Sequence, residues 1–277
     1  MYLGLNIDQD SSACLFKDGK IFWYNEEKKI TGDKKYDGVP YRCIDQVKQQ
    51  TNSIQQCIVT GYNYNPSDVN NIDNLLEHKG IKTIDKAFSL YTPHHLSHLF
   101  KSYIDSGFDK ARVFVVDGRG SDWYLSDNSE TYETCSIYDI DKHSYKCIYK
   151  VLYSRLNHKG KVNINYIPSV NKKTMFKDYL PLSITNKTKF NVSSKLDLGH
   201  FYARTSFHFN FKDQEGKFMG LQSYGKYNKD HYKIIKNLKE DTFEKLPKTF
   251  DAAFTCQKYF EDKYLELVKK YKYKNMV

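Results

Sequence analysis

The chain has 277 residues, enough for one large domain or two small ones, each with a core of its own. Hydrophobic residues make up 40% of it and charged residues 27%, proportions that exclude a globally disordered chain. The formal net charge of +10 leaves nucleic acid open as a partner, although lysines spread along a chain are also the ordinary solvated face of a folded protein.

The sequence shows no targeting or membrane segment. Asp8 and Asp10 interrupt the first apolar stretch, which argues against a signal peptide. No apolar run approaches the ~20 residues of a membrane helix, so we expect no membrane partner. The six cysteines form no CxxC pair, and reduced thiols in a cytoplasmic protein are the simplest account of them.

The first part of the chain reads as strands and helices in alternation. Apolar runs around the Asp18-Gly19 turn signal predict a mixed sheet that begins with three strands, at residues 2–7, 12–17 and 20–25. The later patterns predict a helix over 41–50, a strand over 56–60, a helix over 67–78 and a strand over 87–90. This order predicts an α/β fold.

The second part begins with the clearest pair of elements. Periodicity predicts a helix over 95–106, and the run Arg112–Val116 predicts a buried strand. We expect antiparallel strands over 123–125, 134–138 and 145–153, a loop-rich insertion over 155–190, and helices over 196–209, 231–238 and 254–271. Residues 215–226 read as a loop punctuated by glycines, and the lysine-rich end over 269–274 as a frayed helix end.

His94, His98 and Asp117 are the candidate metal ligands. Histidines four residues apart project from the same face of a helix, so their imidazoles reach one cation. Asp117 directly follows a buried strand, where α/β folds place ligands. Two imidazoles and a carboxylate suit Fe(II), Mn(II) or Zn(II). The competing interpretation is that the histidines are surface or packing residues.

Three glycines and a lysine are candidate cofactor-binding residues. Gly216 and Gly220 allow close approach of a phosphate to the backbone, and Lys217 supplies a mobile cation. Gly118, next to Asp117, allows the same approach at the strand end. No Walker motif is present, and a surface turn is the alternative for residues 215–225.

Asp10 and Ser12 are the candidate catalytic residues. They lie at a junction between two predicted strands, where a carboxylate and a hydroxyl would orient a nucleophile or magnesium. Asp and Ser also favour turns for backbone reasons, and that alternative stays open.

Taken together, these segments resemble one family. Leu3–Ile7, Asp10–Ala13 and Lys17–Ile21 resemble the opening of the nodulation-protein and antibiotic O-carbamoyltransferases. The family's later segments are matched, in order, by Glu26-Glu27 with Lys35 and Pro40, His94–His98 ("HHLAHA"), Val115–Gly118 ("VVDGxG"), Gly199–Tyr202, and Glu215–Gly225 ("EGKvMGLApYG").

The resemblance implies a fold and an activity. It implies an actin-like ATPase fold, which is ribonuclease-H-like, with a mixed sheet, flanking helices and an incomplete second lobe. Residues 1–155 would form the first lobe with the metal site, and 156–277 a loop-rich insertion and part of the second lobe. The family makes carbamoyl-adenylate from carbamoyl phosphate and ATP in a YrdC-like domain, and its metal domain transfers the carbamoyl group to an acceptor hydroxyl. Divalent metal and ATP or carbamoyl-adenylate are the implied cofactors.

Departures from the family pattern define the alternatives. Gln9 stands where the family has a histidine. The "SGGxALN" segment, the last aspartate ligand and the YrdC-like domain do not occur in the 277 residues. We therefore expect a companion chain to supply the missing segments, and expect this chain alone to bind ATP weakly and transfer no carbamoyl group. The acceptor would be a small molecule or a nucleotide. The alternative function is a catalytically silent partner subunit that binds metal or nucleotide.

Overall fold

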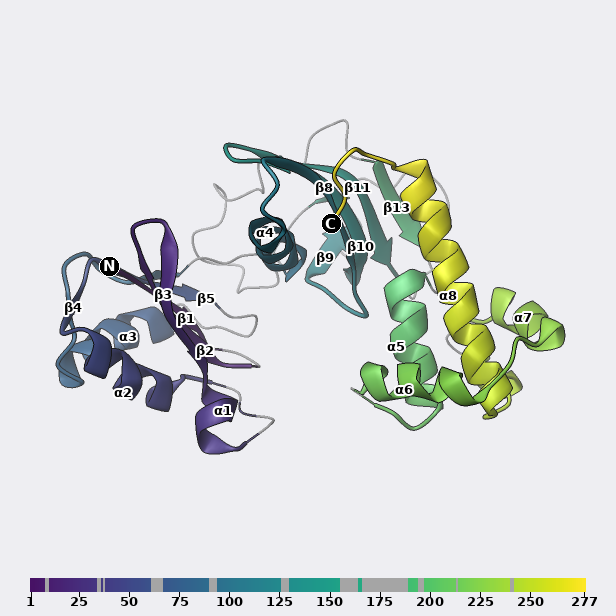
Figure 1. Ribbon diagram of the computed structural model, residues 1–277, viewed down its shortest axis with the longest axis horizontal. Coiled ribbons are helices and arrows are strands. Elements are labelled where there is room, and N and C mark those ends of the chain that lie inside the picture. The colour runs from purple at the N-terminus through teal and green to yellow at the C-terminus, as the bar shows by residue number, and fades with distance from the viewer. Residues whose placement is uncertain are drawn as a thin grey trace. The chain divides into compact units, whose positions relative to one another are not determined.

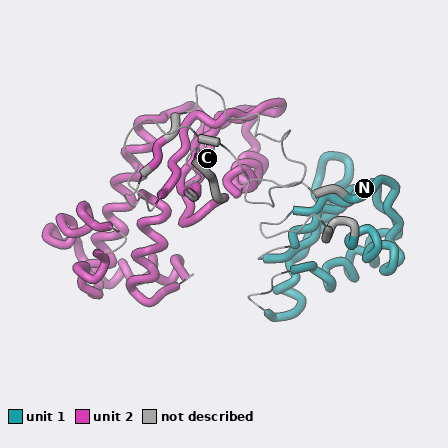
Figure 2. The backbone as a smooth tube through the Cα atoms, turned by 180° about the vertical axis from the view of Figure 1, so that it is seen from behind, with its two compact units in different colours: residues 1–92 teal, residues 93–277 magenta. Residues whose placement is uncertain are grey.

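The computed structural model describes residues 1–7, 10–33, 36, 38–60, 67–89, 94–125, 130–154, 164–165, 189–193, 197–212, 214–239 and 242–277. The chain forms two compact units, residues 1–92 and 93–277 (Figure 2). Each unit has its own sheet and its own buried core.

The first unit is built on a five-stranded mixed sheet (Figure 1). Its strand order is β3 (Lys20–Glu26), β2 (Ser12–Lys17), β1 (Tyr2–Asn6), β5 (Gln56–Thr60) and β7 (Phe88–Ser89). The first three strands pair antiparallel, whereas β5 is parallel to β1 and to β7. Asp18 and Gly19, with φ of 50° and 78°, make the tight turn between β2 and β3. The three predicted opening strands are therefore confirmed.

Helices α2 (Tyr41–Gln50) and α3 (Ser67–His78) pack on this sheet. Leu3 and Leu5 of β1, like Ile44 of α2 and Leu76 of α3, are fully buried. The short helix α1 (Glu27–Thr31), absent from the sequence prediction, brings the buried Glu27 to the start of α2. β4 (Ser53–Ile54) and β6 (Lys82–Thr83) form a separate two-stranded parallel ladder.

The second unit holds a six-stranded sheet centred on the long strand β10 (Glu130–Asp141). One edge of β10 pairs with β9 (Asp122–Leu125) and then with β8 (Lys110–Val116), and the other edge pairs with β11 (Tyr145–Tyr153). β12 (Ile164–Asn165) extends the sheet beyond β9, and β13 (Lys189–Ser193) lies parallel to β11. The predicted strands at 112–116, 123–125, 134–138 and 145–153 are confirmed.

Helices cover both faces of this sheet. Leu96 and Leu99 of α4 (His94–Ser106) pack with Val113 and Val115 of β8. A second core joins α5 (Leu198–His208), α6 (Glu215–Leu221), α7 (Lys229–Lys236) and α8 (Phe250–Lys270), with the 3-10 turns Gln222–Tyr224 and Phe243–Lys245. Figure 1 shows α5 and α8 side by side against the strands.

Two sequence predictions need correction. Residues 215–226 are not a loop, because α6 and the following 3-10 turn occupy most of that range. The chain end is not frayed either: Asn275–Val277 hydrogen-bonds along the free edge of β8, where Phe114 N donates to Val277 O at 2.9 Å. The two compact units divide between residues 92 and 93, and β13 and α5 continue the fold of β8–β11. The division into lobes at 1–155 and 156–277 stays a prediction. Most of the predicted loop over 155–190 lies outside the described residues.

The α/β class is confirmed, and the assignment of either unit to an actin-like lobe stays a prediction. Of the helices that the structure describes, none combines the length and the apolar character that crossing a membrane requires.

Candidate metal centre

The start of α4 places two imidazoles side by side. The helix begins at His94, so His94 and His98 are one turn apart on the same face. Their Nε2 atoms are 3.0 Å apart and their ring centroids 4.7 Å apart. Both rings are partly exposed. The sequence prediction that these two side chains share one face is confirmed.

Asp117 completes the group from the end of β8. Its Oδ2 atom lies 2.6 Å from His94 Nε2 and 3.8 Å from His98 Nε2. The backbone N–H of Gly118 donates to the other oxygen, Oδ1, at 2.6 Å, which leaves Oδ2 facing the imidazoles. One ligand atom from each of the three residues falls within 4.8 Å of the others. The three predicted ligands are therefore brought together.

This donor set fits a divalent transition metal. Asp117 Oδ2 is buried, and the imidazoles of His94 and His98 approach it at 2.6 Å and 3.8 Å. Burial acts to raise the pKa of Asp117, but the hydrogen bond and charge of His94 outweigh it and hold that pKa below its usual range. Burial and the neighbouring His94 lower the pKa of His98. At neutral pH the group thus offers a carboxylate and a neutral imidazole, the forms that bind metal.

A buried carboxylate beneath the site holds the start of α4 in place. Glu133 Oε1 accepts hydrogen bonds from the backbone N–H groups of His95 and Ser121, both at 3.2 Å. Ser121 Oγ in turn accepts from His94 N at 2.8 Å. Two helix-terminal N–H groups are thereby satisfied by groups from the strand side. The position of His94 is fixed by the same network.

Lys150 of β11 balances the charge of Glu133. Its ammonium forms a buried ion pair with Glu133 Oε2 and also donates to Ser136 Oγ at 2.7 Å. Burial lowers the pKa of His95 to about 3, so Lys150 is the charged partner of Glu133 at neutral pH. Each member of the pair stabilises the charged form of the other, which lowers the pKa of Glu133 and raises that of Lys150. Sequence patterns gave no signal for this pair.

Glycines make the close packing at the site possible. A Cβ on Gly199, in the first turn of α5, would lie 1.8 Å from Asp117 O. A Cβ on Gly120 would lie 2.4 Å from Glu133 Cγ and 2.8 Å from the His95 ring. Real Cβ atoms do not approach other atoms so closely, so both positions require glycine. Packing also favours glycine at position 118, because an added Cβ would lie 2.9 Å from Ala203 Cβ of α5.

An aromatic cluster that the sequence analysis missed lies beside the Asp117 segment. The Arg119 guanidinium sits over the Tyr132 ring, 4.9 Å from its centroid. The Tyr132 hydroxyl is hydrogen-bonded to His200 Nδ1 at 2.8 Å, and the His200 ring stacks on Tyr153 at 4.3 Å. His200 belongs to the Gly199–Tyr202 segment. That segment resembles the family, but no role was predicted for its residues.

The family model described as the carbamoyltransferase N-terminus matches residues 45–275, a range that contains all three candidate ligands. This chain belongs to the carbamoyltransferase family.

Other comparisons add little to that assignment. A search of curated proteins found no match for this carbamoyltransferase chain. Among solved structures it is similar to YeaZ from Pseudomonas aeruginosa, with 9% sequence identity, a TM-score of 0.28, and coverage of 59% of this chain and 67% of that chain. A TM-score this low carries no argument about the fold.

The other candidate residues of the carbamoyltransferase lie on other elements than the metal group, apart from Gly118. Asp10 and Ser12 belong to the first unit, where Asp10 has a left-handed φ of 58° and pairs with Lys28 at 2.6 Å. Lys217 lies exposed on α6 with Gly216 and Gly220, and a Cβ on either glycine would meet no atom within 4 Å. The segment predicted as a phosphate-binding loop forms helix α6. The cofactor role of these residues stays a prediction.

Proposed function

We propose that this chain provides the metal-binding part of an O-carbamoyltransferase, which transfers a carbamoyl group from carbamoyl-adenylate to an acceptor hydroxyl. Membership of the family supports carbamoyl transfer in general. The observation that carries the finer proposal is the convergence of His94, His98 and Asp117 within the matched range. The acceptor class is a small molecule or a nucleotide.

His94, His98 and Asp117 would hold the metal. Bound there, a divalent ion would polarise the carbamoyl carbonyl and neutralise a phosphate of the adenylate. Asp117 contributes a carboxylate whose second oxygen is already held by Gly118 N–H, so its orientation is set before anything binds. Glu133 and Ser121 fix the backbone of the histidine pair, which keeps the group preorganised.

We also propose that further segments complete the site. The second nucleotide segment and the last aspartate ligand of the family do not occur among these 277 residues. Either a companion chain or a further part of the same polypeptide would supply them. ATP or carbamoyl-adenylate would then be enclosed between this chain and those segments.

A metal titration tests the ligand set directly. Cobalt(II) added to the metal-stripped 277-residue chain should give visible d–d absorption with one-to-one stoichiometry. His98→Ala should weaken binding by more than about 100-fold, because one of three protein ligands is lost. His143→Ala, an exposed histidine in a turn, is the matched control and should bind as the wild type does. Equal affinity of His98→Ala and His143→Ala would refute the ligand assignment.

A carbamoyl-transfer assay tests the reaction. The chain together with the missing family segments and a YrdC-like domain should convert ATP and carbamoyl phosphate to carbamoyl-adenylate and transfer the carbamoyl group, and His98→Ala should abolish that transfer. The rival function is a catalytically silent partner subunit. The Asp10–Lys28 ion pair favours that rival, because it occupies a candidate catalytic carboxylate. Normal metal binding without any transfer in the completed complex would support the silent subunit.

A further inference from the structure

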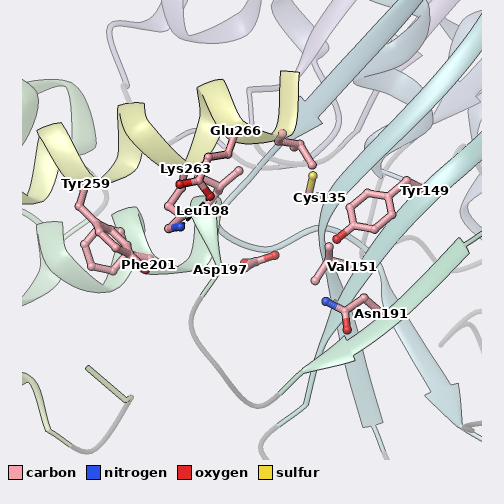
Figure 3. Close-up of a pocket in the computed structure, with 11 residues that line it drawn as sticks. Cys135, Tyr149, Val151, Asn191, Asp197, Leu198, Phe201, Tyr259, Lys263 and Glu266 are labelled. Carbon is pink, nitrogen blue, oxygen red and sulfur yellow. Dashed lines mark hydrogen bonds and ion pairs between the residues drawn. The ribbon is translucent and has the colours of Figure 1, made fainter. Parts of the chain in front are cut away.

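A pocket of about 250 Å³ lies between the sheet of the second unit and helix α8 (Figure 3). Lys150 points under α4 toward Glu133, whereas its neighbours Tyr149 and Val151 line this pocket. Successive strand residues point to opposite faces of a sheet, so the pocket and the Glu133–Lys150 pair are on different faces. The pocket is therefore separate from the support beneath the candidate metal group.

Asp197 presents an unused acceptor to this pocket. The residue precedes α5, and its Oδ2 atom accepts a hydrogen bond from Thr134 Oγ1 at 2.5 Å. The other oxygen, Oδ1, is buried and has no hydrogen-bond partner in the part of the chain that the structure describes. Figure 3 shows the carboxyl group directed into the space between α8 and the strands. A buried acceptor without a donor is costly, so the site calls for a donor from outside the chain.

The charges of the lining residues favour a positively charged donor. Lys263 is the one cation among the described lining residues, and its ammonium is 2.7 Å from Glu266 Oε2. That pair leaves Asp197, which faces the backbone N–H of His200 at the start of α5, as the one side chain among the described lining residues that has no counter-charge when its carboxyl is ionised. Phosphates and carboxylates are disfavoured here, whereas an ammonium group is favoured.

The remaining walls are aromatic and aliphatic. Phe201 and Tyr259 stand with Leu198 on the helical side, and Tyr149 and Val151 on the strand side. Aromatic faces attract cations as well as apolar groups. The volume lies at the small end of ligand pockets, so the occupant is smaller than a typical drug.

We propose that this pocket binds a small primary ammonium compound with an apolar or aromatic body, whose ammonium donates to Asp197 Oδ1. The body packs against Phe201, Val151 and the neighbouring rings. This site is additional to the carbamoyl-transfer function and does not depend on it. No metal ligand takes part in it.

Benzylamine, which is protonated at neutral pH, is the probe. Titrated into the full 277-residue chain and followed by ligand-observed NMR, it should bind saturably with a dissociation constant of about 1 mM. Benzyl alcohol has nearly the same shape without the charge and should bind at least about tenfold more weakly, and benzoate should not bind. Saturable binding with this order of affinities is the expected result.

Three variants make the test specific. Asp197→Asn keeps an acceptor for Thr134 and should weaken benzylamine binding at least about tenfold while leaving benzyl alcohol unchanged. Glu266→Gln, at the exposed rim, frees Lys263 and should also weaken benzylamine. Asp262→Asn removes a carboxylate elsewhere on α8, in a pair with Lys258, and should have no effect.

Several outcomes would overturn the proposal. Equal benzylamine affinity in the wild type and Asp197→Asn would show that the carboxylate is not the recognition group. Tighter binding of benzoate than of benzylamine would reverse the inferred charge preference. Absence of saturable benzylamine binding by a wild-type chain with a normal thermal unfolding transition would also rule out the site.

Discussion

Gly199 sets how closely α5 approaches the candidate metal group. A Cβ there would fall 1.8 Å from Asp117 O, a backbone atom that cannot move aside without displacing the end of β8. We predict that Gly199→Ala lowers the free energy of unfolding by about 1–3 kcal/mol, as overpacking does elsewhere. It should also weaken cobalt(II) binding at least about tenfold, because Asp117 is displaced. Urea unfolding and the cobalt titration measure the two effects.

Gly216→Ala is the matched control for that substitution. Gly216 lies in α6 with no atom within 4 Å of a Cβ, so alanine should preserve stability or raise it by up to about 1 kcal/mol. Metal affinity should not change. If Gly199→Ala behaves like Gly216→Ala, the contact between α5 and Asp117 does not position the ligand.

Asp197 predicts a pH dependence of stability. Burial raises its pKa to about 6, above the ordinary value of 3.8, so the folded state holds this proton more tightly than the unfolded state. Stability is fully present below about pH 4 and declines as pH rises toward 6. Asp197→Asn should lack that decline, so its advantage over the wild type should grow by about 2 kcal/mol between pH 4 and pH 7.

Other groups that face Asp197 do not explain such a change. Burial raises the pKa of Cys135 and raises that of Tyr149 to about 12, so neither loses a proton in this window. Lys263 and Glu266 face it from α8 and form their own ion pair. Urea midpoints measured at half-unit steps from pH 4 to pH 7.5 give the profile. Parallel profiles for wild type and variant would contradict the raised pKa.

At the residue scale, the ligands were predictable and their supports were not. His94 and His98 follow from helical spacing, and Asp117 from its place after a buried strand. Glu133 contacts the backbone at the start of α4, and Lys150 contacts Glu133 from the next strand. No local sequence pattern encodes these contacts. The residue types did not indicate burial either, since a charged residue in a strand is usually exposed.

At the element scale, the Glu133–Lys150 pair joins α4, β10 and β11. Removing one member leaves the other charged and buried without a counter-charge. We predict that Glu133→Gln lowers the free energy of unfolding by about 3–5 kcal/mol, even though glutamine retains an acceptor for the His95 N–H. The double variant Glu133→Gln/Lys150→Met should recover part of this loss, because it removes the stranded ammonium. Urea unfolding of both proteins measures the difference.

An exposed ion pair on α4 provides the comparison for the buried pair. Lys101 and Asp105 form an ion pair one turn apart on the outer side of α4, with both side chains largely exposed. Asp105→Asn should change stability by no more than about 0.5 kcal/mol. A Glu133→Gln variant as stable as Asp105→Asn, or a double variant no better than the single one, would show that the buried pair does not hold these elements together.

Elements with strong local signals were predicted, and those defined by long-range contact were not. α2, α3 and β5 have the bounds that their periodicity predicted. α6 was missed because Gly216 and Gly220 weaken its helical signal, while the burial of Phe218 against Tyr202 and Phe209 stabilises the helix. The isolated bridge at Met276 was missed because only its pairing with β8 defines it.

At the scale of the whole molecule, the metal group and its supports belong to one unit. The three candidate ligands, the Glu133–Lys150 pair and Gly199 all fall within residues 93–277. Two of the three cores found in the described residues are in the same unit. The sequence predicts a first lobe that ends at residue 155, where a polar, loop-rich stretch begins. The later strand β13 pairs with β11 across that stretch, which local patterns do not reveal.

Two fragments of the chain distinguish a boundary at residue 92 from a boundary at residue 155. A fragment of residues 93–277 retains the whole β8–β13 sheet with α4, α5 and α8, so it should unfold cooperatively and bind cobalt(II) within about threefold of the full chain. A fragment of residues 1–155 contains His94, His98 and Asp117, yet it lacks β13 and the α5 turn at Gly199 that packs on Asp117. It should therefore expose one face of the sheet, unfold without a sharp transition, and bind cobalt(II) at least about 100-fold more weakly. Residues 1–92 alone lack all three ligands and serve as the blank. If residues 1–155 bind the metal as the full chain does and residues 93–277 do not, then the metal group belongs to a first lobe that ends near residue 155, and the unit boundary at 92 does not describe how the protein folds.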